Sequence, residues 1–459
     1  MVDELTIFNN GKRAHYNFKH LWIKINSELK QILEPKPDSV VKYAEFIHEY
    51  THYLQSFTTI NGISAMLSYF EAIANILGCI PKRIMNNTYD FKVLIKEEKE
   101  NLLKSHNRLY WQYEKFPSKD TDNKIEYAIE EIMNPIFKQK THEVFILNRN
   151  DNNYYHISSK VLRENMAQMA TFHVRGIGDD AIMDYVSTRG TSYEYWIIFG
   201  YFLYNYPQIE NKVIFTYYFC EFVLLFQCSG EIMYNLLLEI KEMYDDTQYK
   251  SASCFKILDE LMVRHRAEID KNISNLDNLL QIIRNKYIIK SRYGQFYSIL
   301  NKLLDILGKG LDYRKKNVTI FNANTIITGE WVNNMCKIVK SPVIKESNNE
   351  FRVLFDDQDY VNEIYVFIAV TIVIDMYLNN EIISSCPFYK DVPICDEYKR
   401  GVEDICAENP FDIPKFPDGG CAFYNAALIL GILPVSELEK YKEYVPNGVY
   451  EINNWGVQG

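Results

Sequence analysis

The chain has 459 residues, and its composition of 47% hydrophobic and 24% charged residues is that of a globular protein and excludes extended disorder. The length suggests two or three domains. The formal net charge is −10 and basic residues are scattered along the chain, which argues against nucleic acid or an anionic membrane surface as the main partner.

The first predicted helix covers residues 38–57. Pro35 and Pro37 prevent an earlier start, and Asp38 or Ser39 can accept a hydrogen bond from the unpaired amides of the first turn. Apolar residues then recur at helical spacing, at Val40, Tyr43, Ala44, Ile47, Tyr50 and Leu54. We therefore expect one helix with its apolar face in the core.

A second helix is predicted over residues 63–77, after the segment "TINGI" interrupts the first. Its apolar face consists of Met66, Leu67, Phe70, Ile73 and Ala74. The charged stretch that follows, residues 95–116, favours a helix on the surface.

Two β-rich runs on either side of an Asn/Asp-rich turn predict a hairpin at residues 143–157. Helical periodicity resumes at residues 158–172, and the remainder is mostly helical by pattern. Further strands are expected at residues 317–323 and 350–355. These elements predict an α+β fold that is predominantly helical.

The segment "FIHEYTHYLQ" in the first predicted helix contains His48, Glu49 and His52. Positions i and i+4 lie on one helix face, so both imidazoles can reach one zinc ion at about 2.0–2.1 Å. Glu49 is offset by one residue, so its carboxylate lies beside the metal, where a general base is required. Zn²⁺ lowers the pKa of its water to about 7, which makes hydrolysis feasible near neutral pH.

A catalytic zinc ion usually has three protein ligands, so a carboxylate on another helix is expected to complete the site. Glu164 is favoured because its neighbours in "VLRENMAQMA" are apolar and a buried carboxylate needs a cation. Gln168, one turn later, could accept an imidazole N–H. Glu71 is the second candidate, although it shares a polar helix stripe with serine and asparagine residues. Further candidates are Glu194, Glu221 and Glu231.

The same segment also matches Glu-x-x-His twice, at Glu45–His48 and at Glu49–His52. Di-iron carboxylate bundles use that unit, but they require it on two separate helices. None of the other seven histidines of the chain has a glutamate three residues before it, so a di-iron site is disfavoured.

Weaker signals occur further along the chain. Four cysteines near the C-terminal end could hold a structural metal or could be ordinary buried thiols: Cys386, Cys395, Cys406 and Cys421. Residues that could stabilise an oxyanion follow the Glu164 helix: His173, Tyr185, Tyr193 and Tyr195. The chain has no GxxxxGK[ST] or GxGxxG segment, so nucleotide binding is not supported.

The motif His48-Glu49-Tyr50-Thr51-His52, with a glutamate on a later helix, resembles the zincin metallopeptidases of the glutamate-ligand, thermolysin-like branch. The segment "ENMAQ" that starts at Glu164 resembles the third-ligand helices of that branch. This resemblance implies peptide-bond hydrolysis with Zn²⁺, with His48, His52 and Glu164 as ligands and Glu49 as general base. It also implies a zincin-like catalytic domain with a small sheet.

With this resemblance, the expected organisation is a catalytic domain at residues 1–210, with an insertion around 80–155, and a mainly helical domain at 211–459. The predicted function is a zinc-dependent peptidase with a peptide or protein substrate and no nucleic-acid or membrane partner. The alternatives are a non-catalytic zincin-fold binding or regulatory module and a non-peptidase zinc hydrolase. The presence of Glu49 favours catalysis, because a binding module needs no general base.

A cytoplasmic location is expected from two features of the sequence. The first residues show no signal-peptide pattern, and the most apolar windows are too short or too interrupted for the roughly 20 residues of a membrane-spanning helix. Nine cysteines at irregular spacing are more typical of a reducing compartment than of a disulfide framework.

Overall fold

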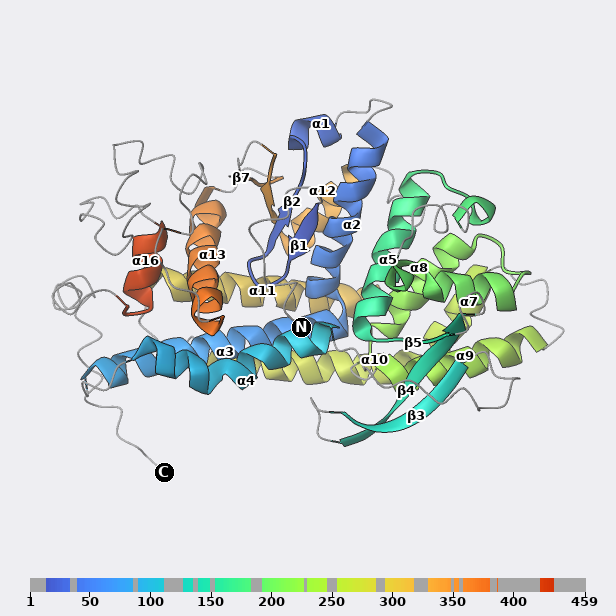
Figure 1. The fold of residues 1–459 in the computed structure, drawn as a ribbon, viewed down its shortest axis with the longest axis horizontal. Helices are drawn as coiled ribbons and strands as arrows, with labels where there is room; N and C mark the ends of the chain where they lie inside the picture. Colours follow the sequence, from blue (N-terminus) through green and yellow to red (C-terminus); the bar gives the residue numbers. More distant parts are fainter. Residues whose placement is uncertain are drawn as a thin grey trace.

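A computed structural model describes most of the chain as a predominantly helical α+β protein with two small sheets (Figure 1). The described residues are 14–33, 39–85, 90–110, 127–134, 139–148, 153–182, 192–226, 229–245, 254–285, 294–317, 329–347, 351–354, 358–379, 386 and 422–432. The predominantly helical α+β class expected from the sequence is confirmed.

Helix α2 (Ser39–Thr58) carries the HExxH motif and matches the prediction for residues 38–57 closely. The next helix, α3 (Ile60–Met85), starts two residues later in a different direction, so that α2 stands at an angle to it in Figure 1. Gly62 permits this turn, because a Cβ there would lie well inside contact distance of the Gln55 carbonyl oxygen. The break expected at "TINGI" is therefore a tight elbow between two helices.

Helix α4 (Phe91–Tyr110) runs beside α3 and corresponds to the surface helix predicted at residues 95–116. Within α3, residues Ile60–Ile80 are long and apolar enough to cross a membrane, but 72% of the most apolar window is buried inside the protein. Burial against neighbouring helices accounts for this apolar composition.

A four-stranded sheet has the order β1–β2–β6–β7, with β1 at His15–Asn17 and β2 at Trp22–Lys24. Strand β2 pairs in parallel with β6 (Val343–Lys345), which pairs antiparallel with β7 (Phe351–Arg352). The strand predicted at residues 350–355 is thus present as β7. This sheet joins strands from both sides of the domain boundary expected near residue 210, and the two-domain division stays a prediction.

The second sheet has three strands: β3 (Tyr127–Asn134), β4 (Gln139–Asn148) and β5 (Asn153–His156). The antiparallel pair β4–β5, with Phe145 opposite His156, confirms the predicted hairpin. Strand β3 was not expected from the sequence pattern. The strand predicted at 317–323 falls almost entirely outside the described residues.

Helix α5 (Ser159–Val174) confirms the prediction for residues 158–172. Ser158 caps it, because its Oγ accepts the N–H of Val161 at 3.3 Å. Helix α5 packs along α2, and Figure 1 shows the two side by side at the centre of the molecule. This packing brings a segment more than 100 residues away in sequence against the HExxH helix.

The remaining elements that the structure describes are all helical. They are α1 (Leu29–Leu33), η1 (Tyr193–Tyr195), α7 (Ile197–Asn205), α8 (Lys212–Val223), α9 (Ser229–Asp245), α10 (Cys254–Ile283), α11 (Gly294–Lys316), α12 (Gly329–Val339), α13 (Gln358–Leu378) and α16 (Ala422–Ile429).

Helix α11 fixes the C-terminal end of α2. Gly310 on α11 lies so close to Phe57 O that a Cβ at this position would clash with it. The buried Arg314 Nε donates to Thr58 O at 2.6 Å, and Nη2 of the same side chain pairs with Glu221 Oε1 at 2.8 Å. The end of the HExxH helix is thereby held by a buried ion pair between α11 and α8.

Candidate metal centre

His48 and His52 on α2 and Glu164 on α5 form one cluster. Glu164 Oε2 lies 3.4 Å from His48 Nε2 and 3.3 Å from His52 Nε2. The two imidazole rings meet edge to face, with their centroids 5.0 Å apart. Among the described residues this is the group of three candidate metal ligands whose ligand atoms come together, all within 4.8 Å of one another.

The spacing of these atoms fits a zinc ion. Two ligand atoms at about 2.0–2.1 Å from a tetrahedral zinc ion are about 3.3–3.4 Å apart. The two distances from Glu164 Oε2 to the imidazole nitrogens are 3.3 and 3.4 Å. The three side chains are each only 11–15% exposed, so the cluster is mostly shielded but reachable from solvent.

The His52 ring is held by Gln55, three residues later on α2. Gln55 Nε2 donates to Arg163 O at 3.1 Å, which orients the amide so that Oε1 faces His52 Nδ1 at 3.0 Å. Because an amide oxygen can only accept, Nδ1 of His52 is the protonated nitrogen. The lone pair of His52 Nε2 therefore points at Glu164.

The His48 ring is oriented by Thr171 on α5. Thr171 Oγ1 donates to Ala167 O at 3.0 Å, and its lone pairs accept His48 Nδ1–H at 3.3 Å. This arrangement also leaves Nε2 of His48 unprotonated. Two nitrogen lone pairs and a carboxylate oxygen then converge on one point, which is unfavourable without a shared cation and suits Zn²⁺.

The electrostatics of Glu164 are consistent with this arrangement. Burial would raise the pKa of its carboxyl group, but when Nε2 of His52 or His48 carries a proton in place of a metal ion, the positive charge and hydrogen bond of that ring hold the pKa well below its ordinary range. Glu164 is therefore an anion at neutral pH, the form in which a carboxylate binds a metal ion.

Glu49 lies beside this cluster and has a different environment. Its Oε2 accepts the backbone N–H of Tyr16, in β1, at 2.6 Å. Burial raises the pKa of Glu49 to about 7 and the charge of Glu164 adds to this effect, whereas His48 and the Tyr16 N–H oppose it. A carboxyl group with a pKa near neutrality can both accept and return a proton at physiological pH.

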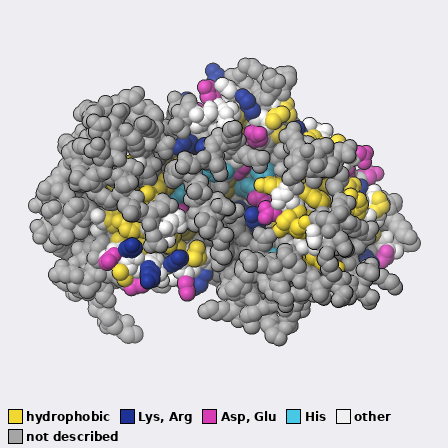
Figure 2. Space-filling model, in the orientation of Figure 1, with side chains coloured by type: hydrophobic (Ala, Val, Ile, Leu, Met, Phe, Trp, Pro, Cys, Tyr) yellow, Lys and Arg dark blue, Asp and Glu magenta, His cyan; other side chains and the backbone are white. Residues whose placement is uncertain are grey.

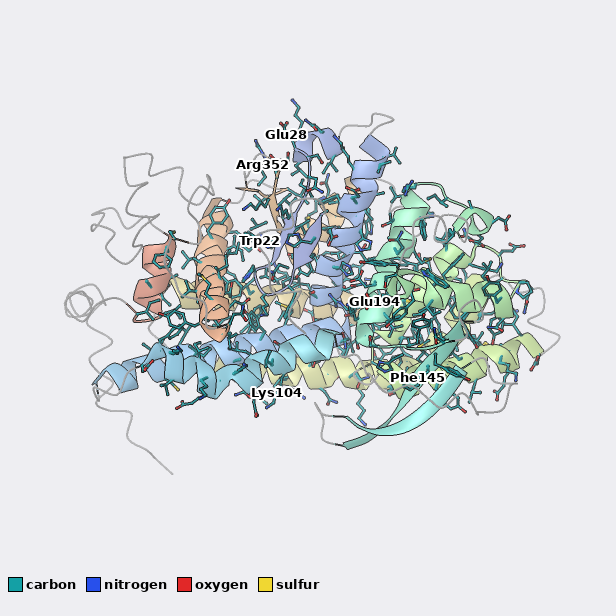
Figure 3. All side chains as sticks on the ribbon, viewed as in Figure 1. Trp22, Glu28, Lys104, Phe145, Glu194 and Arg352 are labelled. Carbon is teal, nitrogen blue, oxygen red and sulfur yellow. The ribbon has the colours of Figure 1, made fainter. Side chains whose placement is uncertain are left out.

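Tyr195 in η1 lies beside the cluster, with its ring centroid 6.0 Å from that of His48. Asn165, next to Glu164, fixes this segment: its Nδ2 donates to Glu194 O at 2.6 Å and its Oδ1 accepts Ile198 N–H at 3.1 Å. Figure 3 shows Glu194 beside α5. Tyr195 is thus the predicted oxyanion residue that the structure places next to a candidate ligand.

The other predicted third ligands lie elsewhere. Glu71 is on α3 and is not part of the cluster. Glu194 Oε1 pairs with Lys160 Nζ at 3.1 Å, and Glu221 is buried in its pair with Arg314. Glu231 lies on α9. Of the candidates whose side chains the structure describes, Glu164 is therefore the one that lies against the two histidines.

Several weaker sequence signals are separated from the site or lie outside the described residues. His173 lines a small apolar space between α5 and α8, and Tyr193 packs on Tyr155, with a distance of 4.1 Å between ring centroids. Cys386 is a buried free cysteine. The candidates outside the described residues are Tyr185, Cys395, Cys406 and Cys421.

Sequence reasoning missed the residues that hold the imidazoles. Gln168 was expected to accept an imidazole N–H, but Thr171 and Gln55 occupy that role. Thr171 lies seven residues after Glu164, two helical turns along the same face of α5, so this spacing was an available signal. Gln55 lies three residues after His52, which places it within reach on the same helix.

No protein-family model, curated protein or solved structure matches this chain. The chemical interpretation therefore depends on the geometry of the site. Histidine side chains are visible near the middle of the face shown in Figure 2, where described acidic and hydrophobic side chains also reach the surface.

Proposed function

We propose that the protein is a zinc-dependent hydrolase that cleaves peptide bonds. In this proposal His48, His52 and Glu164 hold the metal ion, and Glu49 is the general base. One observation carries it: one carboxylate oxygen lies 3.3 and 3.4 Å from two imidazole nitrogens, whose rings contact Gln55 and Thr171, and a buried glutamate lies next to this group. The proposal includes a zincin-like catalytic domain and a cytoplasmic location.

A bound zinc ion supplies Lewis acidity and makes water a nucleophile near neutral pH. With the metal ion held by His48, His52 and Glu164, Glu49 would take a proton from the attacking water and pass it to the leaving amine. Tyr16 N–H occupies Oε2 of Glu49, so Oε1 is the atom assigned to carry the proton. Because both partners are buried or half-buried, this hydrogen bond keeps the carboxylate in one orientation through the reaction.

The position of β1 supports a peptide as the substrate. Strand β1 is at the end of its sheet in the described strand order, and it packs against α2 at Glu49. An edge strand can bind an extended peptide through backbone hydrogen bonds, and because Glu49 already uses the Tyr16 N–H, such a peptide would have to use the backbone groups of β1 that remain. A peptide aligned on β1 would place a peptide bond beside Glu49 and the metal ligands.

The test uses a peptide mixture made by digesting cellular proteins, incubated with zinc-loaded protein, with new termini read by mass spectrometry. We expect the wild type to create new termini and Glu49→Gln to create none. Glu45→Gln is the matched control, because Glu45 is an exposed glutamate one turn earlier on the same helix. Because the charge of Glu45 adds only weakly to the raised pKa of Glu49, this variant should cleave nearly as well as the wild type does.

Three results would decide against the proposal in different ways. If the wild type binds zinc but leaves the peptides intact, a non-peptidase hydrolase or a binding module becomes the better interpretation. If Glu49→Gln cleaves as well as the wild type does, Glu49 is not the base. Equal loss of cleavage in Glu45→Gln and Glu49→Gln would indicate a general effect on α2.

A further inference from the structure

Reciprocal hydrogen bonds join the turn of α2 that carries His52 to the turn of α5 that carries Glu164. Gln55 Nε2, on α2, donates to Arg163 O at 3.1 Å, so that it holds the peptide group next to Glu164. In the other direction, Arg163 Nη2 donates to His52 O at 3.2 Å and to Ser56 Oγ at 3.1 Å. We call this arrangement the Gln55–Arg163 clamp.

The clamp acts on both sides of the metal cluster. The amide oxygen of Gln55 accepts His52 Nδ1–H at 3.0 Å, and its amide nitrogen holds the backbone beside Glu164. One side chain therefore contacts a ligand ring directly and a second ligand through its neighbouring peptide. Gln55 and Arg163 are each 1% exposed, so water does not compete for these bonds.

An apolar side chain would fill the position of Gln55 at lower cost if packing were its only role. Burying an amide is unfavourable unless both its donor and its acceptor are used, and here each is used on a different helix. The polar groups of Gln55 thus contribute to the arrangement of the ligands and not merely to the core.

We propose that Gln55 is a positioning residue that sets the metal affinity of the site. It fixes the His52 ring and the position of α5 relative to α2, so that Glu164 meets both imidazoles before a metal ion binds. The inference rests on the proposed function, since it needs the cluster to bind zinc. Ligands that are already ordered lose less conformational freedom on binding, and this preorganisation raises affinity.

The test measures Zn²⁺ affinity of the full-length, metal-free chain by competition with a chelator, together with its thermal unfolding. Gln55→Met keeps the approximate size of the side chain but removes both hydrogen bonds. It should bind Zn²⁺ about 10–100-fold more weakly, the usual effect of losing a partner of a metal ligand. Gln55→Glu still accepts His52 Nδ1–H but cannot donate to Arg163 O, so it should recover only the part of this loss that comes from the His52 contact.

Tyr53→Phe is the matched control. Tyr53 is buried on the same helix, and its hydroxyl donates to Val339 O at 2.8 Å, towards α12 and not towards the cluster. Removing this hydroxyl should lower thermal stability without changing Zn²⁺ affinity. A visible spectrum of the Co²⁺-substituted proteins gives a second readout, because it reports ligand geometry independently of stability. The spectrum should change in Gln55→Met and not in Tyr53→Phe.

Each outcome separates the clamp from the metal site itself. A wild type that binds no Zn²⁺ defeats the proposed function. If Gln55→Met binds Zn²⁺ as tightly as the wild type does, the positioning role of Gln55 is overturned but the metal site is not. If Gln55→Met does not fold, Gln55→Asn, whose shorter side chain cannot reach both partners, decides in its place: unchanged affinity rejects the inference and weaker affinity supports it.

Discussion

Glu49 and Tyr16 are joined by a hydrogen bond from the Tyr16 backbone N–H to Glu49 Oε2 at 2.6 Å. Because the donor is a backbone group, the orientation of the candidate base depends on where β1 lies. The turn after β1 is held by Lys19 Nζ, which pairs with Asp375 Oδ1 on α13 at 2.8 Å. The site therefore combines α2, α5 and a sheet edge that α13 holds in place.

The metal content is the first prediction. The purified protein should carry about one zinc ion per chain, because one cluster of three ligands is present among the described residues. Glu49→Gln should keep this zinc ion, since Glu49 is not a ligand and glutamine Oε1 can still accept Tyr16 N–H. Elemental analysis checks both proteins. Absence of zinc from the wild type after reconstitution would contradict the prediction.

Glu164→Ala should lose at least 10–100-fold in Zn²⁺ affinity, because removing a ligand costs no less than removing a ligand's partner. Glu71→Ala is the comparison, since Glu71 was the alternative ligand by sequence and lies outside the cluster. Isothermal titration with Zn²⁺ measures both affinities. The assignment of Glu164 fails if the Glu71 variant shows the larger loss.

Replacing either of two glycines in α3 with alanine should change the free energy of unfolding, in opposite directions at the two positions. A Cβ at Gly62 would collide with the backbone oxygen of Gln55, whereas one at Gly78 has nothing within 4 Å. Gly62→Ala should lower the free energy of unfolding by about 1–3 kcal/mol or more, as overpacking does. Gly78→Ala should raise it by about 0.5–1 kcal/mol through helix propensity. Urea denaturation of both variants measures these changes.

His20 should make the protein less stable in acid. Burial lowers its pKa from the ordinary 6.5 to about 3, and the charges of Lys19 and His15 add to this effect. The ring is held by Thr371 Oγ1, 2.8 Å from Nδ1, while Asp375 Oδ2 lies 3.7 Å from Nε2 and its carboxylate is already paired with Lys19. The folded state therefore keeps His20 neutral between these two pKa values.

Because the unfolded chain binds this proton first, the stabilisation is complete above pH 6.5 and is lost as pH falls towards 3. The contribution to the unfolding free energy changes by at most about 1.4 kcal/mol per pH unit. The difference in stability between wild type and His20→Gln, measured by urea denaturation from pH 7 to pH 4, should shrink as pH decreases. A constant difference would contradict this prediction.

The local sequence determined the HExxH helix and its chemistry. An α-helix places residues four apart on one face, so His48 and His52 point the same way wherever the helix packs. The start of α5 was equally local, since the cap at Ser158 decides it. The hairpin at residues 143–157 followed from strand alternation around polar turn residues.

Only the tertiary structure decided which glutamate meets the histidines. Periodicity shows which face of a helix is buried but not which helix covers it, so Glu71 and Glu164 could not be separated until α5 was placed against α2. The same holds for Tyr16, Thr171 and Arg163, whose bonds to α2 cross between elements distant in sequence. Such contacts depend on packing of the whole core, which local residue patterns do not encode.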